Sequence, residues 1–341
     1  MAKRPTIAVT LGDPGGIGPE VIAKSLADAA RRTRARWRIH GTKAAVHAAC
    51  ASAGIDPSWL DEIQFVSSGF DDRDFARSPN ARGGSASFAW VNKAVDEALS
   101  PKEDPARVDA VVTGPISKTA WALAGHTRFP GHTELLADRC GTSRFAMMFR
   151  APTSEAALTP RPGLHVILAT VHIPLRAVAS ALSKESILQT IELGDVTMRR
   201  FGYQPPRIAV CGLNPHAGEH GLLGTEDESI ILPAVRAAQA KGIDAHGPFP
   251  ADTVFSRALE YPRRRAEFDL VVAMYHDQGL IPLKTLAWDR AVNMTVGLPF
   301  IRTSPDHGTA FDIAGSNIAN AGSMAAAMDA AIELATPQLI G

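Results

Sequence analysis

Three histidines stand at the ends of apolar runs that have the composition of buried strands. His172 follows "VILATV", His216 follows "IAVCGLNP" and His276 follows "LVVAMY". Ligands of open α/β sheets bind beyond the carboxyl ends of the strands, so these runs would deliver three imidazoles to one edge of a sheet. Three protein ligands with an open fourth position form a catalytic divalent metal site, in which the ion polarises a bound oxygen. The pattern therefore favours His172, His216 and His276 as metal ligands.

Two carboxylates accompany these histidines. Asp277 directly follows His276, and Asp252 lies in "GPFPADTVF". Either can orient an imidazole, complete the coordination or accept a proton. The alternative for each histidine is a hydrogen-bonded structural role, which is the commoner role of a single histidine at a strand end.

Other polar residues occupy comparable positions and suit an anionic substrate. His132 and Thr133 lie in "FPGHTE", a turn leading into a helix, where backbone N–H groups favour an anion. Lys284, Asn293 and Arg302 follow the third histidine, and two cations with an amide can hold a phosphate or carboxylate by charge-assisted hydrogen bonds. Each of these residues has an alternative as a helix cap or a surface residue.

The glycine-rich loop "GDPGGIGPE" (12–20) lies between an expected strand and an expected helix. It does not match the dinucleotide-binding fingerprint, because the third glycine of G-x-G-x-x-G would fall at Val21. It does not match the Walker loop either, because no G-K-[ST] follows.

The elements that must position these residues alternate along the chain. Short β-branched runs at 6–11, 36–41, 109–114, 164–172, 207–214, 269–276 and 291–297 predict strands. Alanine-rich patterns at 19–30, 87–99, 184–201 and 228–242 predict helices. This alternation is typical of an α/β fold with mostly parallel sheets flanked by helices. The Pro- and Thr-rich segment 150–163 is expected to be an exposed insertion.

Composition narrows the classes of partner. With 35 basic and 35 acidic residues among 341, the formal net charge is zero, so no overall field for nucleic acid or a membrane surface is expected. The most basic window, "RRTRARWR" (31–38), is interpreted as a solvated helix end rather than a nucleic-acid patch. Three dispersed cysteines and the absence of a long apolar run predict a cytoplasmic protein without disulfides.

Several motifs together resemble a known family. "GDPGGIGPE", "TGPISK", "FPGHTE", "ATVHIPL", "GLNPHAGE", "AMYHDQGLIPLK" and "VNMTVGLPFIRTSPDHGTAFDIAG" are similar to motifs of the 4-hydroxythreonine-4-phosphate dehydrogenases of pyridoxal phosphate biosynthesis. The first motif and "DHGTAFDIAGSNIAN" also resemble the opening loop and the adenosine-binding loop of isocitrate and isopropylmalate dehydrogenases.

The resemblance implies a two-domain isocitrate/isopropylmalate dehydrogenase-like fold rather than a standard Rossmann domain. Residues 1–125 plus 300–341 would form the domain with the terminal segments and cofactor loops. Residues 126–299 would form the metal, substrate and dimerisation domain, with the active site in the cleft between the two. The resemblance implies a homodimer in which His276 reaches the metal site of the partner subunit.

The resemblance also implies the ligands. The enzyme would use NAD or NADP and one divalent cation per subunit, zinc, magnesium or cobalt. Its metal ligands would be His172, His216 and His276, and its substrate-binding residues His132, Thr133, Lys284, Asn293 and Arg302. The matched loops suggest the cofactor-binding residues Gly12, Asp13, His307, Gly308, Asp312 and Asn320.

The expected reaction is oxidation of 4-phosphohydroxy-L-threonine at C3, followed by decarboxylation to 3-amino-2-oxopropyl phosphate, with Asp252, Asp277 or water taking the proton. Rival hypotheses are a paralogue acting on a phosphorylated sugar acid or a cis-dihydrodiol dicarboxylate, a zinc hydrolase, and a non-catalytic metal-binding protein. The loop "HGTAFDIAGSNIAN" separates the last two from a dehydrogenase, because neither needs an adenosine site.

Overall fold

Runs of β-branched and apolar residues form the strands, and the helices between them present one apolar face to the sheet. The computed structural model describes residues 4–71, 75–152, 163–261 and 264–336. Most of the expected insertion at 150–163 therefore lies outside the described residues. The chain divides into two compact units, Met1–Ser143 with Leu298–Pro337, and Arg144–Gly297 with Gln338–Gly341.

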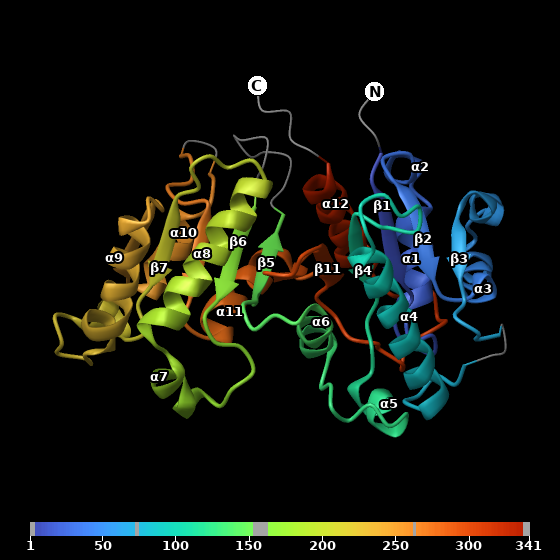
Figure 1. Cartoon of the computed structure of the whole chain (residues 1–341), viewed down its shortest axis with the longest axis horizontal. Helices are drawn as coiled ribbons and strands as arrows, with labels where there is room; N and C mark the ends of the chain where they lie inside the picture. The colour runs from blue at the N-terminus through green and yellow to red at the C-terminus, as the bar shows by residue number, and fades with distance from the viewer. Residues whose placement is uncertain (1–3, 72–74, 153–162, 262–263, 337–341) are drawn as a thin grey trace. The chain divides into compact units, whose positions relative to one another are not determined.

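The first unit contains a five-stranded parallel arrangement in the order β3-β2-β1-β4-β11 (Figure 1). Its strands are β1 (Thr6–Thr10), β2 (Arg36–His40), β3 (Gln64–Val66), β4 (Ala110–Thr113) and β11 (Ile301–Pro305). Its helices are α1 (Gly18–Leu26), α2 (Ala29–Arg32), α3 (Lys43–Ala53), the 3-10 helix η1 (Pro57–Glu62), α4 (Ala81–Leu99), α5 (Lys118–Leu123), α6 (His132–Cys140) and α12 (Gly322–Ala335).

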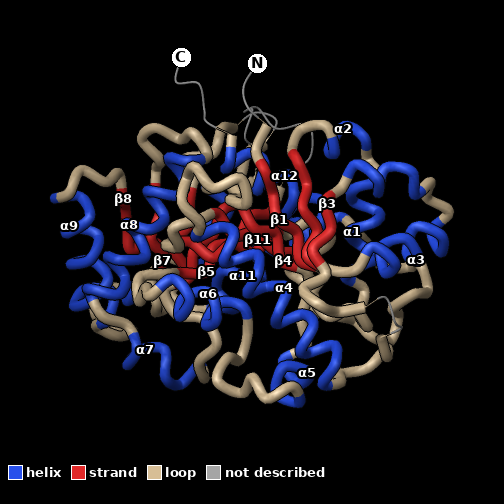
Figure 2. Tube along the Cα trace, turned by 45° about the vertical axis from the view of Figure 1, so that its right-hand side comes forward, coloured by secondary structure: helices blue, strands red, loops and turns tan. Residues whose placement is uncertain are grey.

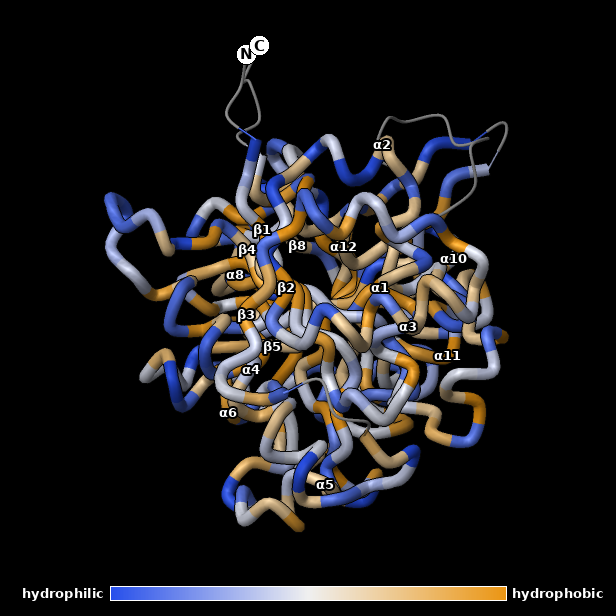
Figure 3. Tube along the Cα trace, turned by 90° about the vertical axis from the view of Figure 1, so that its right-hand side faces the viewer, coloured by the Kyte–Doolittle hydropathy of each residue, from blue (hydrophilic) through white to orange (hydrophobic). Residues whose placement is uncertain are grey.

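Alternation along these strands places apolar side chains on both faces of the sheet. Ala8 and Val111 pack against Val91 and Val95 of α4 and Trp121 of α5. Helix α12 packs on β11 and β4 and also contacts α1, which in turn packs on α3. Figure 3 shows hydrophobic residues concentrated among the strands; β1 is largely apolar, whereas β2 carries two arginines beside Trp37 and Ile39. The sheet is thus buried by helices, as a parallel sheet requires.

The second unit has the strand order β10-β5-β6-β9-β7-β8, in which β5 alone runs antiparallel to its neighbours. Its strands are β5 (Ala146–Ala151), β6 (Leu164–Leu168), β7 (Ile208–Cys211), β8 (Ala245–Phe249), β9 (Leu270–Ala273) and β10 (Val292–Val296). Its helices are η2 (Leu175–Ala177), α7 (Val178–Ala181), α8 (Lys184–Arg200), η3 (Pro215–Gly218), the π-helical η4 (Asp227–Ile231), α9 (Leu232–Ala240), α10 (Ala251–Arg257) and α11 (His276–Ala287).

Helices cover both faces of this sheet as well. Leu280 and Leu283 of α11 pack with Val166 and Val271 in one apolar cluster. On the opposite face Gly194 brings the backbone of α8 close to Leu270, whose side chain would lie 2.5 Å from an added Cβ. Figure 2 shows strands flanked by helices throughout. The expected class, a mostly parallel α/β fold that is not a standard Rossmann domain, is confirmed.

All seven predicted strands are present, but the three that precede the histidines end earlier than the residue pattern suggested. Strand β6 ends at Leu168, β7 at Cys211 and β9 at Ala273. The predicted domain boundaries fell at 125/126 and 299/300, whereas the compact units meet at 143/144 and 297/298. None of the described helices combines the length and apolar character that a membrane span requires.

Candidate functional site

The three histidines follow three adjacent parallel strands of the second unit. The sheet order β6-β9-β7 places the strands that precede His172, His276 and His216 side by side and in the same direction. Their carboxyl ends therefore share one edge of the sheet, as the sequence predicted.

The structure brings two of the histidines together. The ring centroids of His172 and His276 are 5.6 Å apart. His276 is the first residue of α11, and its Nδ1 lies 2.8 Å from Oδ1 of Asp277. This contact leaves Nε2 of His276 available as a donor to a metal, and a carboxylate behind a metal-binding imidazole is the usual supporting arrangement. The resemblance implies that His276 serves the partner's site, but within the chain His276 pairs with His172.

His216 lies on a loop of unusual conformation. Its side chain is 66% exposed, and Nδ1 lies 3.0 Å from Oε2 of Glu219. His216, Ala217, Glu219 and His220 all have positive φ values between 46° and 57°. Such left-handed residues are strained when they carry side chains, so the surrounding structure must hold them in place.

Asp227, which the sequence analysis did not single out, holds this loop. It is fully buried, and its carboxylate accepts hydrogen bonds from the backbone N–H groups of Leu213 and Asn214 and from the Asn214 side chain. Gly212 passes so close that an added Cβ would lie 2.6 Å from Oδ1 of Asp227. Neither a periodicity nor a motif marks such a buried acid, so only the structure reveals it.

The donor set suits a divalent cation, although the described residues contain no group of three His, Cys, Asp or Glu side chains arranged to hold one. Two imidazoles are adjacent, and His276 has the supporting carboxylate that divalent metal sites use. Asp252 is exposed in the first turn of α10, and Asp277 has a side chain that is 72% exposed.

An anion-binding arrangement lies in the first unit. His132 and Thr133 begin α6, where free backbone N–H groups favour an anion. Arg302 is 4% exposed on β11 and donates a hydrogen bond from Nη2 to Oγ1 of Thr113, 2.7 Å away. Burial lowers the pKa of Arg302 to about 10, and the nearby Glu134 carboxylate partly opposes this shift. Burial and the charge of Arg302 hold the pKa of His132 well below its ordinary value.

These shifts show that a cationic guanidinium is held in a poorly solvated place beside a neutral imidazole. A bound anion would compensate the buried charge. Lys284 and Asn293 belong to the second unit, Lys284 on α11 with Nζ 5.2 Å from the Trp288 ring centroid, and Asn293 on β10.

The two segments that resemble cofactor loops pack against each other in the first unit. The N–H of Ile17 donates to the carbonyl of Thr309 at 2.9 Å. Lys24 donates to the carbonyl of Ala319, and the Ala319 N–H donates to Glu20. Gly12 has φ +73°, and an added Cβ would lie 2.2 Å from the carbonyl oxygen of Pro115, so this position requires glycine.

A cavity of about 310 Å³ opens beside these loops. The opening loop contributes Gly15 and Gly16, and the distant loop contributes Ala314 and Gly315. The other walls include alanines of α3 together with Phe75 and Arg77, and the alanines carry no sequence signal because alanine on a helix is indistinguishable from ordinary packing. Cavities of this size hold small ligands.

None of the six predicted cofactor residues is among those that line this cavity. Asp13 is buried with Oδ2 lacking a hydrogen-bond partner among the described residues, and the same holds for Nε2 of His307. Gly308 and Asp312 are exposed, and Asn320 accepts a hydrogen bond from the Gly322 N–H. The two unsatisfied buried polar atoms fit a polar ligand such as NAD or NADP.

Asp13 predicts a pH dependence of stability. Burial raises the pKa of Asp13 from 3.8 to about 6, and the Gly15 N–H only partly offsets this effect. A carboxyl group with a raised folded-state pKa stabilises the fold below its unfolded pKa, and this contribution is lost as the pH rises through about 6. This shift in pKa corresponds to a loss of roughly 3 kcal/mol in the free energy of unfolding. Asp13→Asn keeps the acceptor for Gly15 and removes the charge.

We therefore expect Asp13→Asn to have a higher free energy of unfolding than the wild type above pH 6. The difference between the two proteins should be about 3 kcal/mol larger there than below pH 4. Urea unfolding of both proteins across this range measures the difference. Asp312→Asn, at an exposed position of the distant loop, is the control for charge removal. A difference between Asp13→Asn and wild type that does not change with pH would contradict the prediction.

Several known proteins resemble this chain over nearly its full length. Residues 20–331 match the family described as "Pyridoxal phosphate biosynthetic protein PdxA". The chain is 44% identical to a D-threonate 4-phosphate dehydrogenase of Cupriavidus necator, over 97% of this chain and 98% of that protein. It is also 44% identical to a 4-hydroxythreonine-4-phosphate dehydrogenase of Burkholderia vietnamiensis, over 96% of each chain.

A solved structure gives the same result. The crystal structure of 4-hydroxythreonine-4-phosphate dehydrogenase from Klebsiella pneumoniae superposes with a TM-score of 0.82 at 40% identity, covering 98% of this chain and 99% of that one. The sequence motifs, the fold and these full-length matches agree, and the chain belongs to the PdxA family of dehydrogenases.

Proposed function

We propose that this protein catalyses the NAD- or NADP-dependent, divalent-metal-dependent oxidation of 4-phosphohydroxy-L-threonine. The product, 2-amino-3-oxo-4-(phosphooxy)butanoate, would lose carbon dioxide to give 3-amino-2-oxopropyl phosphate in pyridoxine 5'-phosphate biosynthesis. The observation that carries the proposal is the buried Arg302 beside His132 at the start of α6, which suits a phosphorylated substrate.

The phosphate would be held by residues of both units. Arg302 provides a guanidinium whose orientation is set by Thr113, and the first turn of α6 provides backbone N–H groups together with His132 and Thr133. Lys284 and Asn293 would add a cation and an amide.

The metal and cofactor would supply the oxidation itself. When bound, a divalent cation polarises the C3 hydroxyl, and NAD or NADP accepts the hydride. His172 and His276 would hold the cation, with His216 as the third proposed ligand and Asp277 orienting His276. Asp13 and His307 would meet the cofactor through their unsatisfied buried atoms.

The proton of the C3 hydroxyl needs an acceptor. Asp277 and Asp252 are the proposed acceptors, because both are exposed carboxylates on helices that follow strands of the second unit. Asp277 already lies against His276, so it would combine proton acceptance with orientation of the imidazole. The three cysteines are free, which agrees with the proposed cytoplasmic location.

A second candidate substrate is D-threonate 4-phosphate, because relatives of both activities match at similar identity. The two compounds share the phosphate, the C3 hydroxyl and the carboxylate, and they differ at C2, where one has an ammonium group and the other a hydroxyl. Oxidation at C3 makes a β-keto acid of either, so the same residues serve both reactions.

The test measures NADH or NADPH formation with each compound under saturating divalent metal. We expect a kcat/KM for 4-phosphohydroxy-L-threonine that exceeds the value for D-threonate 4-phosphate. The reverse order would assign the second substrate, and turnover of neither would overturn the proposal. Release of inorganic phosphate without reduced cofactor would instead indicate a hydrolase.

We further propose that the enzyme acts as a homodimer. Helix α11, which begins at His276, exposes Ile281 and Leu286 at 64% and 42%, and its C-cap residue Trp288 is 77% exposed. Large apolar side chains exposed together on one helix are typical of an interface. A second copy of the chain is the occupant that the family resemblance implies.

Mixed dimers test how the ligands are shared. The resemblance implies that His276 serves the partner's site, so a His172→Ala chain and a His276→Ala chain together should restore one intact site, while the other site lacks both residues. Absence of recovery would instead indicate that His172 and His276 of one chain, whose ring centroids are 5.6 Å apart, serve the same ion. Tagged heterodimers are purified and assayed, with wild-type chains paired to either variant as the control. Recovered activity would show that one of the two residues acts across the interface, as the resemblance implies.

A further inference from the structure

A second, larger cavity lies in the first unit, at the amino-terminal ends of the strands. It measures about 850 Å³ and is lined by residues at the starts of β1, β2 and β3 and in the loop that precedes β4. The cofactor loops follow the carboxyl ends of the same parallel strands, so this cavity lies at the opposite edge of the sheet. Nothing in the proposed function uses it.

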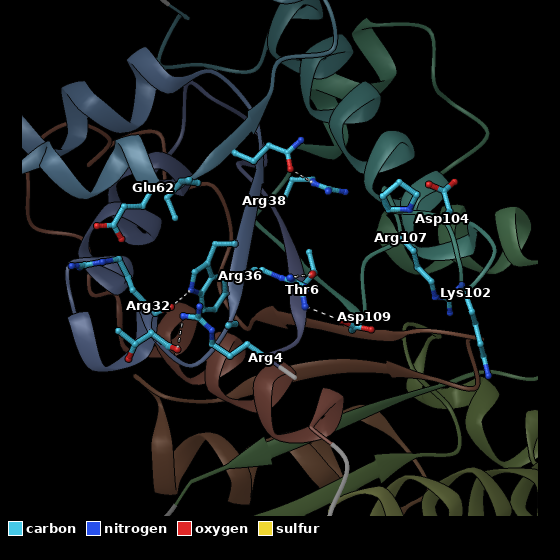
Figure 4. Close-up of a pocket in the computed structure, with 16 residues that line it drawn as sticks. Arg4, Thr6, Arg32, Arg36, Arg38, Glu62, Lys102, Asp104, Arg107 and Asp109 are labelled. Carbon is cyan, nitrogen blue, oxygen red and sulfur yellow. Dashed lines mark hydrogen bonds between the residues drawn. The ribbon is translucent and has the colours of Figure 1, made fainter. Parts of the chain in front are cut away.

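Cations dominate this groove. Arg4, Arg32, Arg36, Arg38, Lys102 and Arg107 line it, against three carboxylates, Glu62, Asp104 and Asp109. Figure 4 shows Arg4, Arg32 and Arg36 toward one end and Lys102 and Arg107 toward the other. Three of these arginines come from the basic window 31–38, which was interpreted as a solvated helix end. Only Arg32 lies on helix α2, whereas Arg36 and Arg38 lie on β2.

The positive charges of the groove are only partly neutralised by carboxylates of the chain. Arg38 is the exception, because it is buried and pairs with Glu97 at 3.0 Å. Among the described residues, none of the other five cations forms an ion pair with a carboxylate. Asp109 accepts a hydrogen bond from the Thr6 N–H at 2.7 Å, and Asp104 accepts one from the Ala106 N–H at 2.8 Å. Two of the three carboxylates are thus occupied by backbone groups.

Neutral acceptors hold the unpaired guanidinium groups in place. Arg4 donates to the carbonyl of Thr33 at 3.3 Å, and Arg32 donates to the carbonyl of Leu26 at 2.6 Å. Arg36 donates from Nε to Oγ1 of Thr6 at 3.2 Å, and Arg107 donates to the carbonyl of Ser100. These contacts orient the side chains without neutralising their charge, so an anion in the groove would meet pre-positioned donors.

We propose that this groove is a binding site for a small molecule carrying two or more phosphate groups, separate from the active site. Guanidinium groups match phosphate oxygens in pairs, and several around one cavity favour a ligand with several charges. The volume suits a ligand of nucleotide size. A nucleic acid is disfavoured because the chain as a whole has zero formal charge and offers no extended field.

Isothermal titration of the full-length protein with inorganic tripolyphosphate at low salt tests the proposal. We expect one saturable site, weakened by added salt. In Arg4→Gln/Arg36→Gln the affinity should fall by about tenfold or more for each guanidinium removed. Arg34→Gln is the matched control, because Arg34 belongs to the same basic window but pairs with Asp329 and does not line the groove.

Two further arms identify the ligand and the site. Equal affinity for ATP and tripolyphosphate would show that the phosphates alone are recognised, and tighter binding of ATP would show that the nucleoside also contributes; both support the proposal. Because the proposed cofactor site can also take phosphate, the titration is repeated with saturating NADP, which should leave the groove site open. Lys102→Gln provides a second variant should the double variant fail to fold.

The proposal is overturned by absence of tripolyphosphate binding, by unchanged affinity in the folded groove variants, or by equal weakening in Arg34→Gln. Tighter binding of a short single-stranded oligonucleotide than of tripolyphosphate would likewise overturn it in favour of a nucleic-acid surface.

Discussion

Replacing His276 with alanine should reduce NADH formation by about a thousandfold and remove the divalent metal from the purified protein, because polarisation of the substrate oxygen contributes several kcal/mol to catalysis. His276 is singled out by geometry. Its ring lies 5.6 Å from that of His172, and Asp277 occupies its Nδ1 so that Nε2 remains for the metal. His172→Ala should give the same result.

The fold should survive these substitutions, since β6 and β9 are held by buried side chains such as Ile167 and Val272 rather than by an ion. His246→Ala is the matched control: His246 is also a half-exposed histidine against a carboxylate, Asp244, in the second unit, but it was not predicted to bind metal. Asp277→Asn should keep the ligand and lower metal affinity by about ten- to hundredfold. Full activity and full metal content in His276→Ala would return the histidine to a structural role.

The elements that sequence reasoning found are those with strong local patterns. Strands such as β1 and β9 are uniformly apolar and β-branched, and α8 begins with a Ser183 capping box. The missed strands lack such signals. Strand β3 has three residues, β5 (AMMFRA) has no β-branched residue, β8 contains Gly247 and Pro248, and β11 contains a buried arginine. Their strand conformation depends on neighbouring strands, which a local pattern does not contain.

Some features of the candidate site could likewise be predicted from the sequence, and others could not. The shared sheet edge of the three histidines was predictable, because parallel strands deliver their carboxyl ends to one side. The pairing of His172 with His276 and the clamp on the His216 loop by Asp227 were not, because both depend on backbone paths through irregular loops. The groove was missed for a related reason: three of its cations belong to the window 31–38, which was interpreted as a helix end, and the other three come from separate segments that the parallel sheet brings beside it.

Replacing Arg302 with alanine should lower kcat/KM for the phosphorylated substrate by about ten- to more than hundredfold, because a charge-assisted hydrogen bond to phosphate contributes about 1.5 to 3 kcal/mol. The structure supports the upper part of this range. Arg302 is almost fully buried, and Thr113 fixes one of its nitrogens. Burial has already removed water from the guanidinium, so little further desolvation opposes the contact with phosphate.

The substrate without its phosphate separates binding from folding. If Arg302 acts on the phosphate, Arg302→Ala should lower kcat/KM for the phosphorylated compound far more than for 4-hydroxy-L-threonine, since the second compound never made the contact. Arg302→Lys keeps the charge but lacks the planar pair of donors, so its kcat/KM for the phosphorylated compound should lie between those of the wild type and Arg302→Ala. Thr113→Val removes only the orienting hydroxyl and is the smallest perturbation of the set. Equal losses on both substrates would mean that Arg302 maintains the fold of β11 and β4 rather than recognising phosphate.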